Sequence, residues 1–459
     1  TLPVENRSYF YPSVSGSVVF TELLPKNDVL TFGKLRGSWA KVGKDASPYS
    51  TNTYLWGIEV VNGEFQGVGN SWTGGSPYLL PEIQTSWEIG TELKFFNGRL
   101  GIDYTYYNSV TGNQIAAPRL CQSTGYIFLT INSGSVKNEG MELMITGTPV
   151  DTKDFTWDLV LNMSGNRGTL GDFVEGVDYF YVTDAQIGGV KAASIPNGGA
   201  FLGLTGNYWL RETEEVQDVD EETGELLFND KGEPIMVDKE IEGGRYQIDP
   251  NTGLYKLQGN TTNVVGNREP TFIGGLTSNF RWKDLSFSFL FDFRMGGDIY
   301  NGTQYYLTSL GQSMRTLDRT QVTLDGVNSN TGEPMTVTYK AGETYEINGS
   351  VRSGEYMIQS YWSNYCSNAY NFLQKVNWLR LRNINLSYDF SNLIKGQDVL
   401  KGLVATFTAN NLFYVTNYVG GMDPEASMGS GTGGSGSVGI DYCGVPSLRS
   451  FSFGLNLTF

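Results

Sequence analysis

The sequence predicts an all-β protein, an antiparallel transmembrane β-barrel segment of about eleven strands, and three observations carry that prediction. Apolar and polar residues alternate through most of the chain, which gives each strand one apolar and one polar face. Short and long connections follow each other strictly, so every long connection falls at the same end of the strands. Charged residues are few, at 17%, and aromatic residues are many, at 13%, as expected of an outer wall that contacts lipid.

The C-terminal segment shows the alternation most clearly. Phe451, Phe453, Leu455, Leu457 and Phe459 alternate with serine, glycine, asparagine and threonine. The polar face of this segment carries no charge, whereas a strand of a soluble sandwich usually presents charged side chains to water. An amphipathic strand that closes on a terminal phenylalanine is typical of the last strand of an outer-membrane barrel.

Taken in chain order, the other strands are recognised by the same alternation and by the short turns that join them in pairs. Asn97-Gly98, between two alternating segments, is the strongest of these hairpin signals. The alternation changes parity near Arg382 and Asn383, which predicts a β-bulge there. The predicted strands cover residues 13–20, 31–43, 87–95, 100–106, 141–145, 155–163, 272–282, 285–295, 379–390, 407–413 and 448–459.

The long connections are predicted to be extracellular loops, because outer-membrane barrels have short periplasmic turns and long external loops. We expect residues 1–459 to form the C-terminal part of a barrel. An odd number of antiparallel strands does not close by itself, and a bilayer leaves no backbone edge unpaired. Partner strands are therefore expected from a further part of the protein. The long loops cover approximately residues 44–81, 112–134, 171–270, 296–371 and 416–446.

Composition excludes several kinds of function. A net charge of −16 argues against nucleic-acid binding, which requires basic patches. The chain contains no histidine, so it has no Ser-His triad and no His-ligated metal. Cys121, Cys366 and Cys443 are widely spaced and give neither a metal motif nor a disulfide framework, although one pair could form a bridge. We expect no cofactor and no enzymatic activity.

Two acidic patterns were tested for chemistry. Residues 218–229 resemble the start of a calcium-binding loop, but Asn229 stands where a carboxylate is required, so a hairpin around 229–232 is the better prediction. A similar hairpin is predicted at 332–337. Asp103 and Glu142 form a carboxylate pair of the kind that glycosidases use; the preferred interpretation is that both simply face a polar barrel interior.

Several segments carry a family resemblance. "SWEIGTELKFFNGRLGIDYTYYN", "NREPTFIGGLTSNFRWKDLSFSFLFDFRMGGDIYN", "FTANNLFYVTNYVGGMDPE" and "SLRSFSFGLNLTF" closely resemble the C-terminal barrel half of SusC-like TonB-dependent transporters, the RagA/SusC family of the Bacteroidetes outer membrane. The resemblance implies a twenty-two-stranded barrel whose plug and first strands lie outside this chain. It also implies a SusD-like surface lipoprotein as lid and the TonB-ExbB-ExbD motor, which acts through the N-terminal region.

The same resemblance implies import of oligomeric nutrients, with oligosaccharides favoured and peptides as the alternative. An outer-membrane barrel enzyme and a passive adhesin or structural barrel are the alternatives of other classes. The absence of histidine and of a nucleophile motif disfavours the enzyme, and a plug domain would exclude the adhesin.

Aromatic clusters in the long loops are the candidate ligand-binding residues, because flat rings with a polar edge bind sugars or peptides well. The loop at 296–371 is favoured because it borders two clearly predicted strands. The alternative is that its rings pack within the loops or against the lid. The predicted substrate-binding residues are Tyr305, Tyr306, Tyr361, Trp362 and Tyr365.

Overall fold

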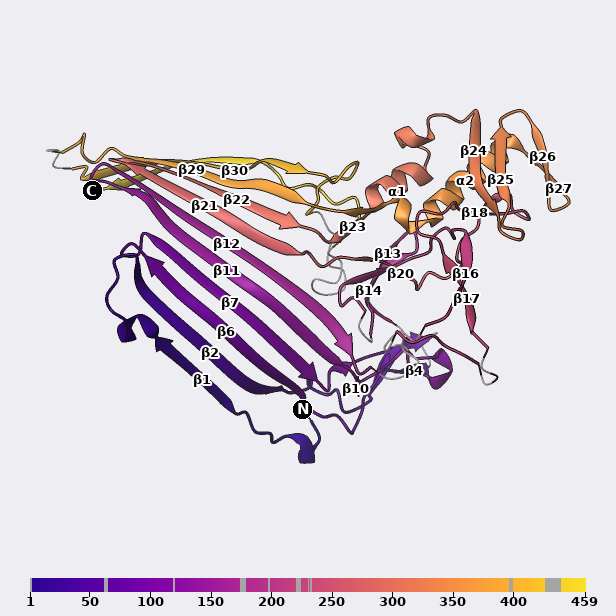
Figure 1. Ribbon diagram of the computed structural model, residues 1–459, viewed down its shortest axis with the longest axis horizontal. Helices are drawn as coiled ribbons and strands as arrows, with labels where there is room; N and C mark the ends of the chain where they lie inside the picture. The colour runs from indigo at the N-terminus through magenta and orange to yellow at the C-terminus, as the bar shows by residue number, and fades with distance from the viewer. Residues whose placement is uncertain are drawn as a thin grey trace.

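One antiparallel sheet of eleven strands dominates the computed structural model (Figure 1). The structure describes residues 2–61, 65–118, 120–173, 179–196, 199–219, 224–229, 231, 233–395, 399–425 and 439–459. Strands adjacent in the chain are adjacent in the sheet, as in an up-and-down barrel. The strands, in their spatial order, are β1 (Ser13–Val19), β2 (Leu30–Lys44), β6 (Glu82–Phe95), β7 (Leu100–Gly112), β11 (Ser135–Asp151), β12 (Phe155–Gly171), β21 (Phe272–Trp282), β22 (Leu285–Met295), β29 (Trp378–Asp389), β30 (Gly402–Thr416) and β32 (Ser450–Thr458).

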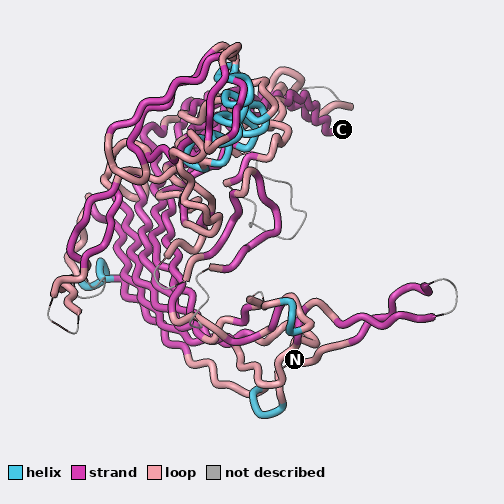
Figure 2. The backbone as a smooth tube through the Cα atoms, turned by 90° about the vertical axis from the view of Figure 1, so that its right-hand side faces the viewer, coloured by secondary structure: helices cyan, strands magenta, loops and turns pink. Residues whose placement is uncertain are grey.

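The sheet is curved and open. Viewed from the loop end, it forms an arc around a hollow, with loop segments gathered above and beside it (Figure 2). The short turns and the C-terminus lie at one end of the strands, and all the long loops extend from the other end (Figure 1). The predicted strand count and the predicted sorting of the loops are therefore confirmed. Within the described part of the chain, β1 and β32 each pair on one side only.

The predicted turns form where the sequence allows a left-handed backbone. Asn97 and Gly98 have φ of 57° and 87° and lie in the connection that pairs Phe95 with Leu100. Lys283 also takes a positive φ, 53°, in the two-residue turn between β21 and β22. These turns fix the register of their hairpins, since a slip of one residue would exchange the two faces of the sheet.

The predicted bulge lies at Arg382. Leu381 pairs with Phe291 and Asn383 pairs with Leu290, so Arg382 has no partner of its own in the ladder to β22. The ladder to β30 is shifted at the same place, and Asn411 there has a φ of 53°. The bulge aims Arg382 and Asn383 toward the same side of the sheet, because both Leu290 and Arg382 line the interior.

The face of the sheet turned away from the hollow is an apolar wall. Phe451, Phe453 and Leu455 are exposed by 61%, 84% and 72%. On β22 the outward rings of Phe287, Phe289 and Phe291 contact one another in sequence, with centroids 6.0 and 5.5 Å apart. No soluble protein leaves an apolar face of this extent in water, so the wall suits a lipid environment.

Some strands are longer than predicted. β11 and β12 have 17 residues each, whereas alternation was recognised only over 141–145 and 155–163. The added residues, such as those of 135–140, lie at the loop end and are mostly polar or small. A strand that continues beyond the hydrocarbon layer has no need of an apolar face, so its sequence resembles a loop.

The long loops fold into small sheets and two helices. The hairpin predicted at 332–337 is confirmed by the antiparallel pairing of β24 with β25, which begins at Pro334. Of the hairpin predicted around 229–232, residues 230 and 232 lie outside the described residues, and the flanking Phe228 and Pro234 form a β-bridge. In the described part of the chain, no helix is long and apolar enough to cross a bilayer. The loop elements are β3 (Leu55–Val61), β4 (Phe65–Asn70), β5 (Thr73–Gly74), β8 (Ile115–Ala116), β9 (Phe128–Leu129), β10 (Ile131–Asn132), β13 (Phe180–Ile187), β14 (Val190–Ser194), β15 (Gly203–Thr205), β16 (Thr213–Gln217), β17 (Met236–Glu240), β18 (Gln247–Asp249), β19 (Leu254–Tyr255), β20 (Val264–Asn267), β23 (Asp298–Asn301), α1 (Gly302–Ser309), β24 (Gln321–Asn328), β25 (Pro334–Lys340), β26 (Thr344–Ile347), β27 (Ser350–Ser353), α2 (Gly354–Ser367), β28 (Leu373–Lys375) and β31 (Ile440–Asp441).

Candidate functional site: a charged cavity on the inner wall

The inner face of the sheet carries a row of side chains that crosses nine strands. Residues directly opposite each other on neighbouring strands point to the same face, so the strand registers place the whole row on the hollow side. Within the row, small or uncharged residues separate the charged residues from one another. From β2 to β30 the row is Arg36, Gly90, Thr105, Glu142, Ser164, Ile273, Arg294, Trp378 and Thr416.

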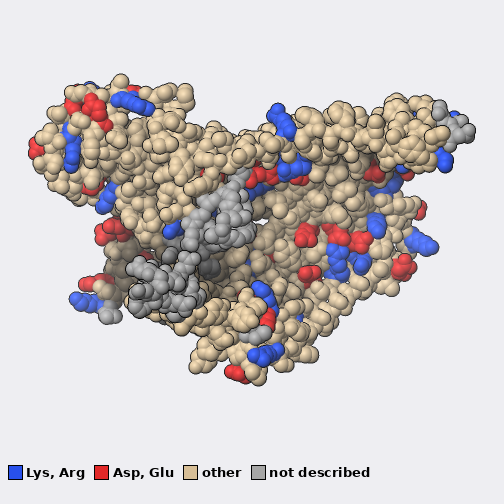
Figure 3. All heavy atoms as spheres, turned by 180° about the vertical axis from the view of Figure 1, so that it is seen from behind, with Lys and Arg blue, Asp and Glu red and all other residues tan. Residues whose placement is uncertain are grey.

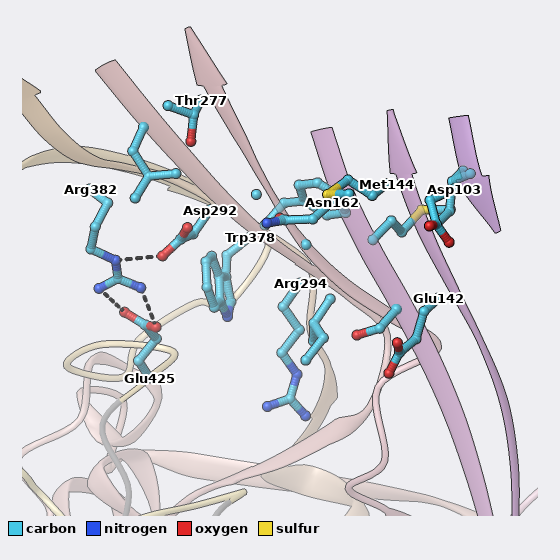
Figure 4. Close-up of a pocket in the computed structure, with 18 of the residues that line it drawn as sticks. Asp103, Glu142, Met144, Asn162, Thr277, Asp292, Arg294, Trp378, Arg382 and Glu425 are labelled. Atoms are coloured by element: carbon cyan, nitrogen blue, oxygen red, sulfur yellow. Dashed lines mark hydrogen bonds and ion pairs between the residues drawn. The ribbon is translucent and has the colours of Figure 1, made fainter. Parts of the chain in front are cut away.

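A cavity of about 1000 Å³ lies over this row and over the neighbouring row of inward-facing residues, two positions along each strand. Charged side chains of both signs gather over the strands on this side of the molecule (Figure 3), and the close-up shows those that reach into the cavity (Figure 4). As predicted, Asp103 and Glu142 face the interior. The charged residues that line the cavity are Arg36, Asp103, Glu142, Asp292, Arg294, Arg382 and Glu425.

On one side of the cavity, Arg36 forms a bidentate ion pair with Asp103. Its two terminal nitrogens lie 3.0 and 2.6 Å from the carboxylate oxygens, and one also donates to the Thr105 hydroxyl at 2.6 Å. Arg36 on β2 crosses over Gly90 on β6 to reach β7. A Cβ at Gly90 would lie 2.6 Å from the Arg36 Nε. Glycine at this position therefore makes the ion pair possible.

Replacing Gly90 with valine is expected to push Arg36 away from Asp103 and to lower the free energy of unfolding by about 1–3 kcal/mol, the usual cost of overpacking. The measurement is urea unfolding of the membrane-inserted protein. Gly112→Val is the matched control, because a Cβ at Gly112 meets no atom within 4 Å. Equal effects of the two substitutions would contradict this role of Gly90.

On the other side of the cavity, the loop between β30 and β32 is held against the inner wall by ion pairs. The side chains of Arg380 and Asp423 are 2% and 1% exposed and form an ion pair. Glu425 lies 2.9 Å from the Arg380 Nε and 2.8 Å from an Arg382 terminal nitrogen. The Arg382 Nε in turn donates to Asp292 at 2.7 Å (Figure 4). A long loop thus folds inward and forms part of the cavity wall.

A buried carboxylate, Asp441, holds the C-terminal part of the loop between β30 and β32 in place. Asp441 is fully buried and accepts hydrogen bonds from the Tyr418 hydroxyl at 2.6 Å and the Thr303 hydroxyl at 3.1 Å. Burial, together with the hydrogen bond to Asp441, raises the pKa of Tyr418 well above its usual value, so this hydroxyl stays protonated and remains a donor. β31 also pairs with β23, which joins the last two long loops into one unit.

The five aromatic residues predicted to bind substrate lie elsewhere, on two helices of the loop at 296–377. Tyr305 and Tyr306 are on α1, and Tyr361, Trp362 and Tyr365 are on α2. All five are half-buried and pack against two apolar cores of the loops. None is among the described residues that line the inner-wall cavity.

The aromatic residues of α1 and those of α2 are connected by ring contacts. Tyr305 and Tyr365 both contact Phe372, with centroids 5.7 and 5.8 Å away, and Trp362 contacts Tyr365 at 5.3 Å. Burial raises the pKa of Tyr361 to about 12. Packing in the loops, the alternative weighed for these rings, accounts for these contacts.

Comparison with known proteins identifies the family. Residues 3–264 match the sequence model of the TonB dependent receptor-like β-barrel. The chain belongs to this family. It is 23% identical over 99% of its length to TonB-dependent receptor P3 of Formosa agariphila, and 28% identical over 82% of its length to TonB-dependent receptor SusC of Bacteroides thetaiotaomicron. The solved structure of the RagAB peptide transporter has the same fold, with a TM-score of 0.65 at 19% identity over the whole chain.

The chain spans less than half the length of these relatives: 42% of receptor P3, 32% of SusC and 44% of the RagAB chain. The resemblance to SusC-like barrels is confirmed, and the described sheet is a segment of a TonB-dependent receptor barrel in the outer membrane of a Gram-negative bacterium. The family consists of transport receptors rather than enzymes. Asp103 and Glu142 face a polar interior, which is the interpretation that the sequence favoured over a glycosidase pair.

The receptor barrel gives no support for a metal site. In the ranges described, no group of three or more Cys, Asp or Glu side chains is arranged to hold a metal ion. Asp220, Glu221 and Glu222 of the acidic loop lie outside the described residues. Cys121, Cys366 and Cys443 are all free thiols, so the bridge that the sequence left open does not form.

In the receptor barrel, a packing role and a ligand-contact role for the α2 rings make different predictions. Tyr365→Ala is expected to lower the stability of the loop unit by about 2 kcal/mol, because a half-buried ring is removed from four aromatic neighbours. Tyr306→Phe removes only a long hydroxyl contact to Tyr442, 3.5 Å, and is expected to cost less than about 1 kcal/mol. Hydrogen exchange of residues 296–377 measures both. A loss of ligand binding by Tyr365→Ala at unchanged protection would instead establish a ligand contact.

Sequence reasoning missed most of the cavity. Trp378 was not predicted to line a cavity, and Asp423 and Glu425 were recognised only as part of a segment that carries the family resemblance. The available signal was the pair of arginines in 378–383, "WLRLRN". Two arginines within a membrane strand require partners, and the acidic pair lies some forty residues further on.

Proposed function

We propose that the protein to which this chain belongs imports an oligomeric nutrient across the outer membrane in a TonB-dependent manner. The observation that carries the proposal is the inner wall: a charged cavity of about 1000 Å³ faces the hollow of the sheet and is partly formed by an external loop. A pocket of this size accommodates several sugar or amino-acid residues. A passive adhesin or structural barrel has no need of such a cavity.

Two classes of cargo are consistent with the inner wall. The sequence favours oligosaccharides, which bind aromatic rings, and exposed rings such as Trp72 and Tyr78, 68% and 82% exposed, remain available at the loop surface. Peptides are the second candidate, because charged side chains outnumber aromatic rings among the described residues that line the cavity. The RagAB neighbours are described as a peptide transporter and a peptide importer.

We also propose the partners. The two one-sided edge strands, β1 and β32, are supplied with neighbours by a further, plug-bearing part of the barrel. A SusD-like surface lipoprotein covers the loop end, and TonB with ExbB and ExbD acts through the N-terminal region. The RagAB peptide importer has been solved in "closed-closed" and "open-open" states, and we propose that the cover over this barrel opens and closes as well.

Uptake by whole cells tests the proposal. Deleting the gene is expected to abolish growth on, and accumulation of, one class of labelled oligomer, and deleting tonB or adding a protonophore is expected to have the same effect. Labelled oligosaccharide and labelled peptide pools are supplied separately to identify the class. Unchanged uptake of both pools in the gene deletion would overturn the proposed function.

A further inference from the structure

Among the described residues, two charged side chains of the cavity form no ion pair. Arg36 neutralises Asp103, and Arg382 is shared between Asp292 and Glu425. Glu142 is exposed and, among the described residues, makes no ion pair and no hydrogen bond. Arg294 forms no ion pair with any described carboxylate; it donates to the backbone carbonyls of Arg268 and Gly296, at 2.7 and 3.2 Å.

These contacts hold Arg294 in place without neutralising it. Two consecutive glycines of positive φ, Gly296 and Gly297, follow β22. A Cβ at Gly297 would lie 2.5 Å from an Arg294 terminal nitrogen, so the glycine makes room for the guanidinium. The side chains of Arg294 and Glu142 extend from the sheet to the same side, into the cavity (Figure 4). One positive and one negative group therefore face the same space.

The register fixes the spacing of Glu142 and Arg294 across the sheet. Glu142 pairs with Ser164, Ser164 with Ile273, and Ile273 with Arg294. The two residues lie three strands apart on one row, which is roughly 14 Å between Cα atoms at about 4.8 Å per strand. An extended peptide advances about 3.3–3.6 Å per residue, so about four residues span this distance.

We propose that Glu142 and Arg294 bind the two ends of a short peptide, Glu142 accepting from its terminal ammonium and Arg294 donating to its terminal carboxylate. The guanidinium suits a carboxylate because it donates two parallel hydrogen bonds. A neutral oligosaccharide offers neither charge, and an acidic one offers only the anion. The inference rests on the proposed import function and selects peptide between its two cargoes.

Binding to the purified full-length transporter with its native partner tests the inference. The probes are penta-alanine with free ends, the same peptide N-acetylated, the same peptide C-amidated, and a neutral glucose pentasaccharide. Calorimetry is expected to show that each cap weakens binding by about tenfold or more, the usual effect of losing one charge-assisted hydrogen bond.

The variants assign each end. Glu142→Gln is expected to bind the free and the N-acetylated peptide equally, and Arg294→Gln the free and the C-amidated peptide equally. Glu88→Gln and Arg281→Gln are matched controls expected to change nothing. Glu88 is exposed on the inner face outside the cavity, and Arg281, also on that face outside the cavity, donates a hydrogen bond to Thr156.

Other outcomes overturn the inference. A response of Arg294→Gln alone would indicate an acidic oligosaccharide. If both variants lost as much affinity for the neutral pentasaccharide as for the peptide, Glu142 and Arg294 would act through contacts within the protein and not on the ends of a peptide. If the wild type bound the pentasaccharide but not the peptide, the inference would fail while the import function stood. Absence of binding for every probe, together with unchanged cellular uptake in the gene deletion, would overturn both.

Discussion

Arg380→Met is expected to detach the inward-folded loop after β30 from the barrel wall, with a loss of about 3–5 kcal/mol in the stability of that contact. Arg380 and Asp423 are almost fully buried, and removing one partner leaves the other as an uncompensated charge away from water. Hydrogen exchange of the amides in residues 417–425 and 439–441 is the direct measurement, because it reports local opening of the loop rather than unfolding of the barrel.

Two further variants show whether burial is the cause. Lys137→Met removes a cation from an exposed pair with Glu139, whose side chains are 44% and 34% exposed, and is expected to cost at most about 1 kcal/mol. The double variant Arg380→Met/Asp423→Leu is expected to recover much of the protection, because it removes both charges together. A double variant as unprotected as Arg380→Met would show that the buried pair is not what holds the loop.

The same contact has a defined pH dependence. Burial raises the pKa of Asp423, but hydrogen bonds from the backbone N–H groups of Glu425 and Ser447 and the Arg380 guanidinium outweigh it, and the pKa stays below its usual value. A carboxylate with a lowered pKa in the folded state stabilises that state above its ordinary pKa, near 4. That contribution is lost as the pH falls through the lowered value. Loop protection is thus expected to be constant between pH 5 and 8 and to fall below about pH 4.

Phe289→Arg is expected to lower the free energy of folding into a bilayer by about 2–4 kcal/mol, whereas Ser288→Arg on the next position is expected to cost less than about 1 kcal/mol. Phe289 lies midway along β22 on the apolar wall, and Ser288 points to the inner face. An arginine at the lipid midplane loses its hydration, but an arginine in a polar interior keeps it. Reversible folding into lipid vesicles measures both variants. Equal costs would contradict the assignment of the two faces.

The strand pattern could be predicted from the sequence because each strand must solve the same local problem. Lipid on one side and a polar interior on the other require alternation, and short turns such as Asn97-Gly98 are recognised by their residue types. Even the bulge at Arg382 left a local trace in the change of parity. Where strands continue beyond the hydrocarbon layer, as at 135–140, alternation is no longer required, so these strand residues were not predicted.

The cavity could not be predicted in the same way, because its contacts depend on where a loop of unknown path lies. Arg380 and Asp423 are 43 positions apart, and no local pattern joins them. Conversely, Tyr361 and Trp362 have the composition of a ligand site but pack on the loop cores. An aromatic residue in a long loop serves equally well as core or as ligand contact, and only its neighbours distinguish the two.

Mass spectrometry of the native outer-membrane complex tests most directly whether this chain is part of a TonB-dependent import barrel. The complex is extracted in mild detergent with a tag in an external loop, and its subunits are identified by mass. We expect the chain to be recovered with plug-bearing barrel sequence, either covalently joined or as a tightly bound subunit, and with a SusD-like surface lipoprotein. Recovery of this chain alone, folded without partner strands or lipoprotein, would contradict the barrel assignment and the import function together.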